Sequence, residues 1–304
     1  MILATQGRSI ALAAACAILA ACTPYARPPS GHDAPNRLQV AVTMSTLASL
    51  VQSVGGDKIE VHSLVPVGAS VETYEPAPGD LVVLSRARLL VENGAGLETW
   101  LSKLLRSGGR TDARILVLSD AVPGLGATSA ARNPHLWLDP IYAIAYVAAI
   151  AAALRSVDPV NARYYEAQSR REIGRLRALD AWTRAQIETI PKSARAMICF
   201  HDAWYYFDRR YGIRDIGAVE PAPGQEPSAG YFAQLVRLAQ QNGVRAVFTE
   251  PQFSPKLARQ LAASAKIATV SDLYDDTVGV SPAPADYEDM MRRDVTTIVR
   301  ALRS

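Results

Sequence analysis

The chain has 304 residues, of which 49% are hydrophobic and 20% charged, and its formal net charge at neutral pH is +3. Behind a short N-terminal leader about 270 residues remain, which is ample for two ordinary α/β domains with buried cores. Because the charge is nearly balanced and no basic stripe is interleaved with aromatic residues, nucleic acid is not expected as a partner.

The N-terminus has the features of a secretion signal. Residues 1–21 contain one basic residue, Arg8, followed by an alanine-rich apolar run that is short for a membrane span. The signal ends in Leu-Ala-Ala-Cys at Cys22, which resembles the lipobox of bacterial lipoproteins and predicts that Cys22 becomes the acylated N-terminus. Residues 22–36 then form a tether, and the protein is expected in the cell envelope, lipid-anchored and facing the periplasm or the cell exterior. Cys199 is left as the one cysteine of the mature domain, so no internal disulfide is expected.

Apolar runs rich in valine and isoleucine alternate with helical segments from residue 37 to residue 158. The predicted strands are residues 38–44, 59–67, 88–91 and 115–118. Ser45 is expected to cap the first helix, and further helices are predicted at residues 79–86 and 97–106. Strands that alternate with helices predict a parallel sheet.

One long helix is predicted at residues 159–190. Asp158 and Pro159 have the form of an N-cap and a first-turn proline, and the next proline is Pro191. Such a helix would be about 45 Å long, the length of a domain. It would restrict closure between the domains that it joins.

The alternation of strands and helices returns from residue 191 to residue 304. The predicted strands are residues 194–200, 215–219, 246–249 and 268–270, and predicted helices begin at Ala203, Ala229, Pro255 and Ala285. The expected fold class is therefore α/β, with two domains that each contain a parallel four-stranded sheet flanked by helices, joined by one long rigid helix.

Two of the four histidines lie where a loop gives way to a helix. His135 occurs in Asn-Pro-His-Leu-Trp-Leu-Asp-Pro and His201 in Cys-Phe-His-Asp-Ala-Trp. Folds of the α/β class gather ligand-binding groups at such junctions, and Glu72 and Asp272 occupy comparable positions. The four side chains can supply nitrogen and oxygen ligands for one transition-metal ion. Each also has an ordinary alternative, as a hydrogen-bonded histidine or a helix cap.

Several segments together resemble a known family. They are residues 64–69 with 73–76, residues 133–140, residues 200–212, and residues 226–230 with 248–254. In this order, over about residues 37–304, the chain is similar to the zinc and manganese solute-binding lipoproteins of bacterial ABC transporters. The resemblance implies two parallel-sheet domains joined by a long rigid helix, one metal ion in the cleft between them, and delivery of that ion to a membrane permease. The protein is expected to be a monomer.

The resemblance places the second, third and fourth ligands of the family on His135, His201 and Asp272. The first position departs from the pattern, because most members have a histidine just before Thr-Tyr-Glu-Pro and this chain has Glu72. A carboxylate still binds zinc or manganese, so the expected ligand set is two imidazoles and two carboxylates. The neighbouring rivals for the two carboxylate positions are Glu75, Asp275 and Asp276.

Zinc is favoured over manganese as the bound ion. Imidazole nitrogens suit zinc, zinc binds more tightly than manganese in a permissive site, and His201 resembles the zinc branch, where the manganese branch usually has a glutamate. Glu72 favours harder ions, so manganese remains the alternative.

Metal-bound imidazoles usually donate their second nitrogen to an acceptor, and the acidic residues predicted for this supporting role are Asp139, Asp202 and Glu250.

Two other functions fit parts of the pattern. A metal-dependent hydrolase needs an open metal position beside a general base, which a non-ligating Glu72 would provide, but no His-Glu-x-x-His or nucleophile-elbow motif occurs. A surface interaction protein of the adhesin type would follow if Glu72 marks a degenerate metal site. The sequence favours the transport protein and predicts no enzymatic activity.

Overall fold

The structure, a computed structural model, describes residues 37–303 except for 109–111, 125–132, 223, 272 and 280–283. Residues Arg37–Ser304 form one compact unit. The predicted signal, the lipidation site at Cys22, the tether and the candidate ligand Asp272 lie outside the described residues.

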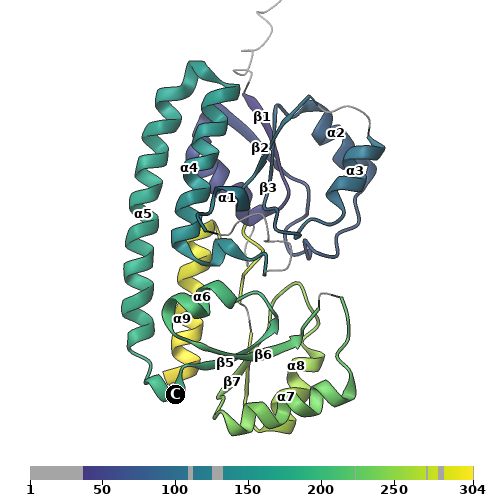
Figure 1. The fold of residues 1–304 in the computed structure, drawn as a ribbon, viewed down its shortest axis with the longest axis vertical. Coiled ribbons are helices and arrows are strands. Elements are labelled where there is room, and N and C mark those ends of the chain that lie inside the picture. The colour runs from purple at the N-terminus through teal and green to yellow at the C-terminus, as the bar shows by residue number, and fades with distance from the viewer. Residues whose placement is uncertain are drawn as a thin grey trace, which may run out of the picture. The chain divides into compact units, whose positions relative to one another are not determined.

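The first half of this unit is built on a four-stranded parallel sheet with the order β2-β1-β3-β4. Its strands are β1 (Leu38–Val42), β2 (Ile59–Ser63), β3 (Leu89–Glu92) and β4 (Arg114–Val117). The associated helices are α1 (Ser45–Gly55), α2 (Pro78–Arg86) and α3 (Leu101–Ser107) (Figure 1). The two inner strands are rich in valine, alanine and leucine that are fully buried, because helices cover the faces of a parallel sheet.

The second half repeats this arrangement, with the sheet order β6-β5-β7-β8 and parallel pairing throughout. Its strands are β5 (Ala196–His201), β6 (Arg214–Glu220), β7 (Ala246–Phe248) and β8 (Ala268–Val270), and its helices are α6 (Tyr205–Tyr211), α7 (Ala229–Gln241) and α8 (Lys256–Ala265). All eight predicted strands are present, and the predicted fold class is confirmed. Where the chain divides into domains stays a prediction.

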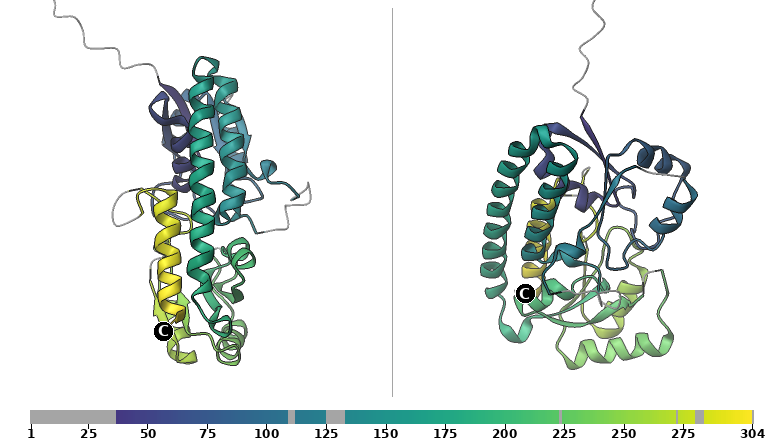
Figure 2. Two further views of the ribbon diagram at one scale, coloured as in Figure 1. Left: turned by 90° about the vertical axis from the view of Figure 1, so that its left-hand side faces the viewer. Right: turned by 45° about the horizontal axis from the view of Figure 1, so that its top comes forward.

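A layer of long helices runs along both halves (Figure 1). It contains α4 (Pro140–Val157), α5 (Ala162–Glu188) and α9 (Tyr287–Arg303), and the last two lie side by side (Figure 2). By length and composition α4 is apolar enough to cross a membrane. It packs instead against α1 and α5 and buries Tyr146, Val147 and Ile150, as the core helix of a soluble protein does.

The predicted long helix is present, although its first turn, Pro159–Asn161, is a 3₁₀ helix. Asp158 precedes this turn, but its carboxylate does not cap a backbone N–H. It accepts hydrogen bonds from the Asn161 amide at 2.7 Å and the Tyr165 hydroxyl at 2.5 Å. The first turns of the helix are therefore tied to Asp158 by side-chain hydrogen bonds, and α4 packs against the helix.

The predicted cap of α1 is wrong. Met44 occupies the N-cap position, and Ser45 is the first helical residue. The Ser45 hydroxyl instead accepts a hydrogen bond from the backbone N–H of Val278 at 3.1 Å, and Ser49 accepts one from the N–H of Tyr287 at 2.9 Å. These bonds fasten the segment between β8 and α9 to a helix of the first half.

Candidate metal site

The three described ligand candidates lie at the carboxyl ends of parallel strands or at the start of a helix. Glu72 lies in the loop between β2 and α2, and His201 is the last residue of β5. His135 immediately precedes the 3₁₀ helix Leu136–Leu138, which leads into α4. In α/β folds these ends are where loops place ligand-binding groups, so segments far apart in sequence meet at one point.

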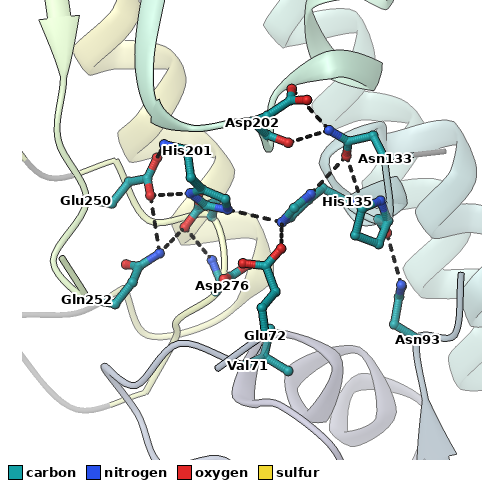
Figure 3. A network of polar contacts seen from close by, with 12 residues as sticks. Val71, Glu72, Asn93, Asn133, His135, His201, Asp202, Glu250, Gln252 and Asp276 are labelled. Carbon is teal, nitrogen blue, oxygen red and sulfur yellow. Dashed lines mark hydrogen bonds and ion pairs between the residues drawn. The ribbon is translucent and has the colours of Figure 1, made fainter. Parts of the chain in front are cut away.

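The structure brings Glu72, His135 and His201 together (Figure 3). The Nε2 atoms of the two histidines face each other at 3.1 Å, and Oε1 of Glu72 lies 3.7 Å from Nε2 of His135. Two nitrogens bound to one tetrahedral zinc at about 2.0–2.1 Å would lie about 3.3 Å apart. The histidine pair therefore already has nearly the separation that a shared ion requires.

Asn133 sets the orientation of His135. Its side-chain oxygen accepts hydrogen bonds from the His135 backbone N–H at 3.0 Å and from ring Nδ1 at 2.9 Å. An amide oxygen only accepts, so Nδ1 carries the hydrogen and Nε2 presents its lone pair to the site. Complete burial, and next the charge of His201, lower the pKa of His135 well below its usual value. His135 is thus held neutral, as a metal ligand must be.

Glu250 sets the orientation of His201 in the same way. Its carboxylate is bonded to Nδ1 of His201, and Asp275 Oδ2 lies 3.4 Å from the same nitrogen. Burial alone lowers the pKa of His201, but the charges of Glu250 and Asp275 outweigh it and raise that pKa well above its usual value. Burial, followed by the charge of Asp275, raises the pKa of Glu250 to about 8. In the metal-free protein His201 is therefore protonated on both nitrogens, with Nδ1 bonded to Glu250 and Nε2 donating to the lone pair of His135 Nε2, and a metal ion has to displace the Nε2 proton.

Two further carboxylates line the site from the segment after β8. Asp275 and Asp276 have 0% and 3% of their surfaces exposed. Both carboxylate oxygens of Asp276, one oxygen of Asp275 and one oxygen of Glu72 are buried without a hydrogen-bond partner, and the charge of Glu72 is among those that act on Asp276. Burial, followed by the charge of Asp275, raises the pKa of Asp276 well above its usual value. Buried oxygens without donors are costly unless a cation compensates them, so this set is suited to a positive ion.

Trp137 fixes this acidic segment next to the histidines. Its indole N–H donates to the carbonyl oxygen of Asp275 at 2.7 Å, and its own carbonyl accepts a hydrogen bond from the hydroxyl of Tyr287 at 2.6 Å. Trp137 is two residues from His135 and fully buried. The carboxylates of the second half are therefore held by the segment of the first half that carries His135.

The other predicted site residues have different surroundings. Asp202 accepts hydrogen bonds from the Asn133 amide, which places it behind His135. Asp139 caps α4 through the backbone N–H of Ile141 at 2.8 Å and lies 3.3 Å from the Arg210 guanidinium, so its contacts are structural. Glu75, the rival of Glu72, is exposed.

The sequence offers Asp276 only as a rival of Asp272, because Asp276 lies six positions beyond the end of β8 rather than directly after it. The available signal was the pair of adjacent aspartates in Leu-Tyr-Asp-Asp. Nothing in their spacing shows which of the two carboxylates lacks hydrogen-bond donors.

Comparison with known proteins decides the family. Residues 40–301 match the family described as zinc-uptake complex component A periplasmic. The chain belongs to this family. It is 28% identical over 267 residues to the manganese-binding lipoprotein MntA of Halalkalibacterium halodurans, which covers 87% of this chain and 88% of that protein. It is also 28% identical over 308 residues to the high-affinity zinc uptake system protein ZnuA of Bacillus subtilis, with 95% of each covered.

The fold agrees with that of a solved protein. The periplasmic zinc-binding protein TroA from Treponema pallidum superposes with a TM-score of 0.81 at 24% identity, over 88% of this chain and 100% of that one. The chain is a substrate-binding protein of a metal ABC transporter and not an enzyme, which confirms both predictions. Its relatives are named for manganese as well as zinc, so the preference for zinc stays a prediction.

Proposed function

We propose that the protein captures one divalent transition-metal ion between Nε2 of His135 and Nε2 of His201, with Glu72 and Asp276 as carboxylate ligands. The observation that carries this proposal is the approach of the two Nε2 atoms to 3.1 Å while hydrogen-bond acceptors hold both Nδ1 atoms. Asp272 was the predicted fourth ligand. Asp276 is the described carboxylate whose buried, unpartnered oxygens fit that role.

The ligand set favours zinc, with manganese as the alternative. Two imidazoles favour zinc, and zinc exceeds manganese in affinity for most sites of mixed nitrogen and oxygen donors. Two carboxylates make the site harder than a site with three histidines, so they reduce the margin by which zinc binds more tightly than manganese. Their two negative charges also balance a divalent cation, since both imidazoles bind in the neutral form.

The ion is the transported cargo. In this proposal the protein is held in the cell envelope by a lipid on Cys22, acts as a monomer, faces the periplasm or the exterior, and passes the ion to its permease. A rigid helix such as α5, packed along both halves, favours release through small local movements of the ligand-bearing loops over a wide hinge opening. The loops that carry Glu72 and Asp276 belong to different halves, so separating them would remove two donors at once.

Metal content tests the proposal. The purified protein is stripped of metal, reloaded with zinc and manganese in competition, and analysed by mass spectrometry under native conditions. We expect one equivalent of metal, mostly zinc, and none in His135→Ala. Lys103→Ala, which removes an exposed side chain of α3, is the matched control and should bind like the wild type. Failure of the folded wild type to bind either ion at micromolar concentration would contradict the proposal.

A further inference from the structure

The sheet of the second half has β6 at one edge and β8 at the other, and a concave site lies at the β8 edge. It is a groove of about 1210 Å³ between one face of α9 and the edge strand β8. No residue that we assign to the metal site lines it. The groove is therefore a separate feature, and the proposed transport function does not explain it.

The groove is strongly basic. Among the described residues that line it, five are cationic and none is acidic, and three more carry aliphatic hydroxyl groups. The cationic residues are Arg245, Lys266, Arg292, Arg293 and Arg300, and the hydroxyl groups belong to Ser271, Thr296 and Thr297. The whole chain has a net charge of only +3, so this concentration of positive charge is local. The Thr296 hydroxyl donates within α9, to the carbonyl oxygen of Arg292 at 2.7 Å, so the cations are the main groups that would bind phosphate or carboxylate oxygens here.

Three of the arginines are held in place by contacts outside the groove, and one of them, Arg293, bonds to Asp289 one turn earlier on α9 at 3.0 Å. Arg292 bonds to Glu288 at 2.8 Å and lies 4.7 Å from the ring centre of Trp182. Arg245 donates to the carbonyl oxygen of Leu302 at 2.7 Å. A guanidinium has five N–H donors, so Arg245 and Arg292 keep donors beyond these contacts. Fixed cations lose less side-chain entropy when an anion binds.

The backbone of Lys266 has an unusual conformation. Lys266 ends α8 in the left-handed conformation with φ of 60°, which glycine normally adopts at this position. A side chain here costs conformational energy that glycine avoids, yet the chain places an ammonium group at the wall of the groove. Unusual backbone conformations of this kind concentrate at functional sites.

The dimensions of the groove indicate a ligand with more than one anionic group. Arg293, Thr297 and Arg300 follow one another on one face of α9, and seven residues of helix span about 10 Å. We propose that the groove binds a soluble molecule with two or more phosphate or carboxylate groups, which contact the basic face of α9 at one end and Lys266 at the other wall. Among the described residues of the lining Tyr274 is the one aromatic, and it is largely buried, so nucleic-acid bases would lack a stacking surface.

Tripolyphosphate is the probe for this proposal. Its binding to the metal-stripped protein is measured by isothermal titration calorimetry at low ionic strength, where charge pairing is least screened. The test variant combines Lys266→Gly with Arg300→Gln. Glycine suits the left-handed backbone at residue 266, so the substitution removes the charge without strain. The matched control is Arg171→Gln with Arg177→Gln, which removes the same charge from exposed positions of α5.

We expect one equivalent of tripolyphosphate in the wild type, binding at least about tenfold weaker in the groove variant, and binding within about twofold of wild type in the control. Zinc affinity should be unchanged in all three, so failure of the metal-site proposal would be seen separately. Three results would overturn the proposal: no binding at millimolar tripolyphosphate, equal weakening in both variants, or binding only to vesicles that contain phosphatidylglycerol.

Discussion

Replacing Glu72 tests the position at which this chain departs from its relatives. The Glu72 side chain is 12% exposed, Oε1 lies 3.7 Å from Nε2 of His135, and Oε2 is buried without a partner. Burial is the main cause of the raised pKa of Glu72, so without a bound cation this carboxylate is a destabilising group. Glu72→Ala should therefore have opposite effects on the stability of the metal-free protein and on the binding of metal.

In the metal-free form, Glu72→Ala should leave thermal stability unchanged or raise it, because a buried acid is removed. In the metal-bound form, the loss of one of four ligands should weaken zinc binding by at least about tenfold, or about 1.4 kcal/mol. Glu72→His should restore zinc binding and lower the relative affinity for manganese, since an imidazole replaces a harder oxygen donor.

The assay is competition with a chelating dye for each metal, with thermal denaturation of the stripped and loaded proteins. Glu72→Gln is the matched control for size, because it keeps the shape of the side chain and removes the charge. His135→Ala and His201→Ala calibrate the loss of a true ligand. If both histidine variants lose metal while Glu72→Ala keeps the affinity and selectivity of the wild type, Glu72 is not a ligand and the reasoning fails.

The remaining predictions concern the other groups around the ion and the anchor. Asp276→Asn should weaken zinc binding at least about tenfold in the dye competition and Asp275→Asn less, whereas the reverse order would reassign the ligand. Asn133→Ala should weaken zinc binding about ten- to a hundredfold, and Asn133→Asp should weaken it less, because aspartate keeps the hydrogen-bond acceptor for Nδ1 of His135. Equal losses in the two variants would show that Asn133 does not position His135 through this acceptor. The pKa of Glu250 is raised from 4.5 to about 8, so the metal-free folded protein retains a proton that the unfolded chain releases. The melting temperature of the metal-free protein should therefore fall between pH 5 and pH 8, and added zinc should stabilise the protein more at pH 8. A metal-free melting temperature that rises over this range would contradict the raised pKa of Glu250. Cys22→Ser should leave the protein unacylated and in the soluble envelope fraction, and unchanged mass and fractionation would contradict the lipid anchor.

The regular parts of the fold follow from local patterns in the sequence. Most strands are short apolar runs bounded by turn residues, although β2 and β6 also contain polar residues, and the alternation with helices indicates parallel sheets, so all eight strands could be predicted. The sequence patterns above identify no helix at Pro140–Val157. Its alanine-rich sequence has little polar periodicity, because Tyr146, Ile150 and their neighbours pack against helices on more than one side.

Long-range contacts explain what could not be predicted. Ser45 has the residue type of a helix cap, but its hydroxyl is bonded to Val278, which lies 233 residues away in sequence. Asn133 belongs to a motif that was recognised for His135, yet its role depends on where it lies relative to Asp202. Asp275 accepts hydrogen bonds from the Gln252 amide and the Asp276 backbone N–H, whereas the Asp276 carboxylate has no described donor. This difference depends on contacts that the sequence does not show.

The central claim is that one ion lies between the Nε2 atoms of His135 and His201, and a crystal structure of the zinc-loaded protein tests it most directly. Anomalous scattering measured at the zinc edge should give one peak within about 2.0–2.2 Å of both Nε2 atoms and of a carboxylate oxygen from each of Glu72 and Asp276. His201, Glu250 and Asp275 form a second group whose ligand atoms lie within 4.8 Å of one another, on the Nδ1 side of the ring. A peak among those three residues, or none near His135, would contradict the account.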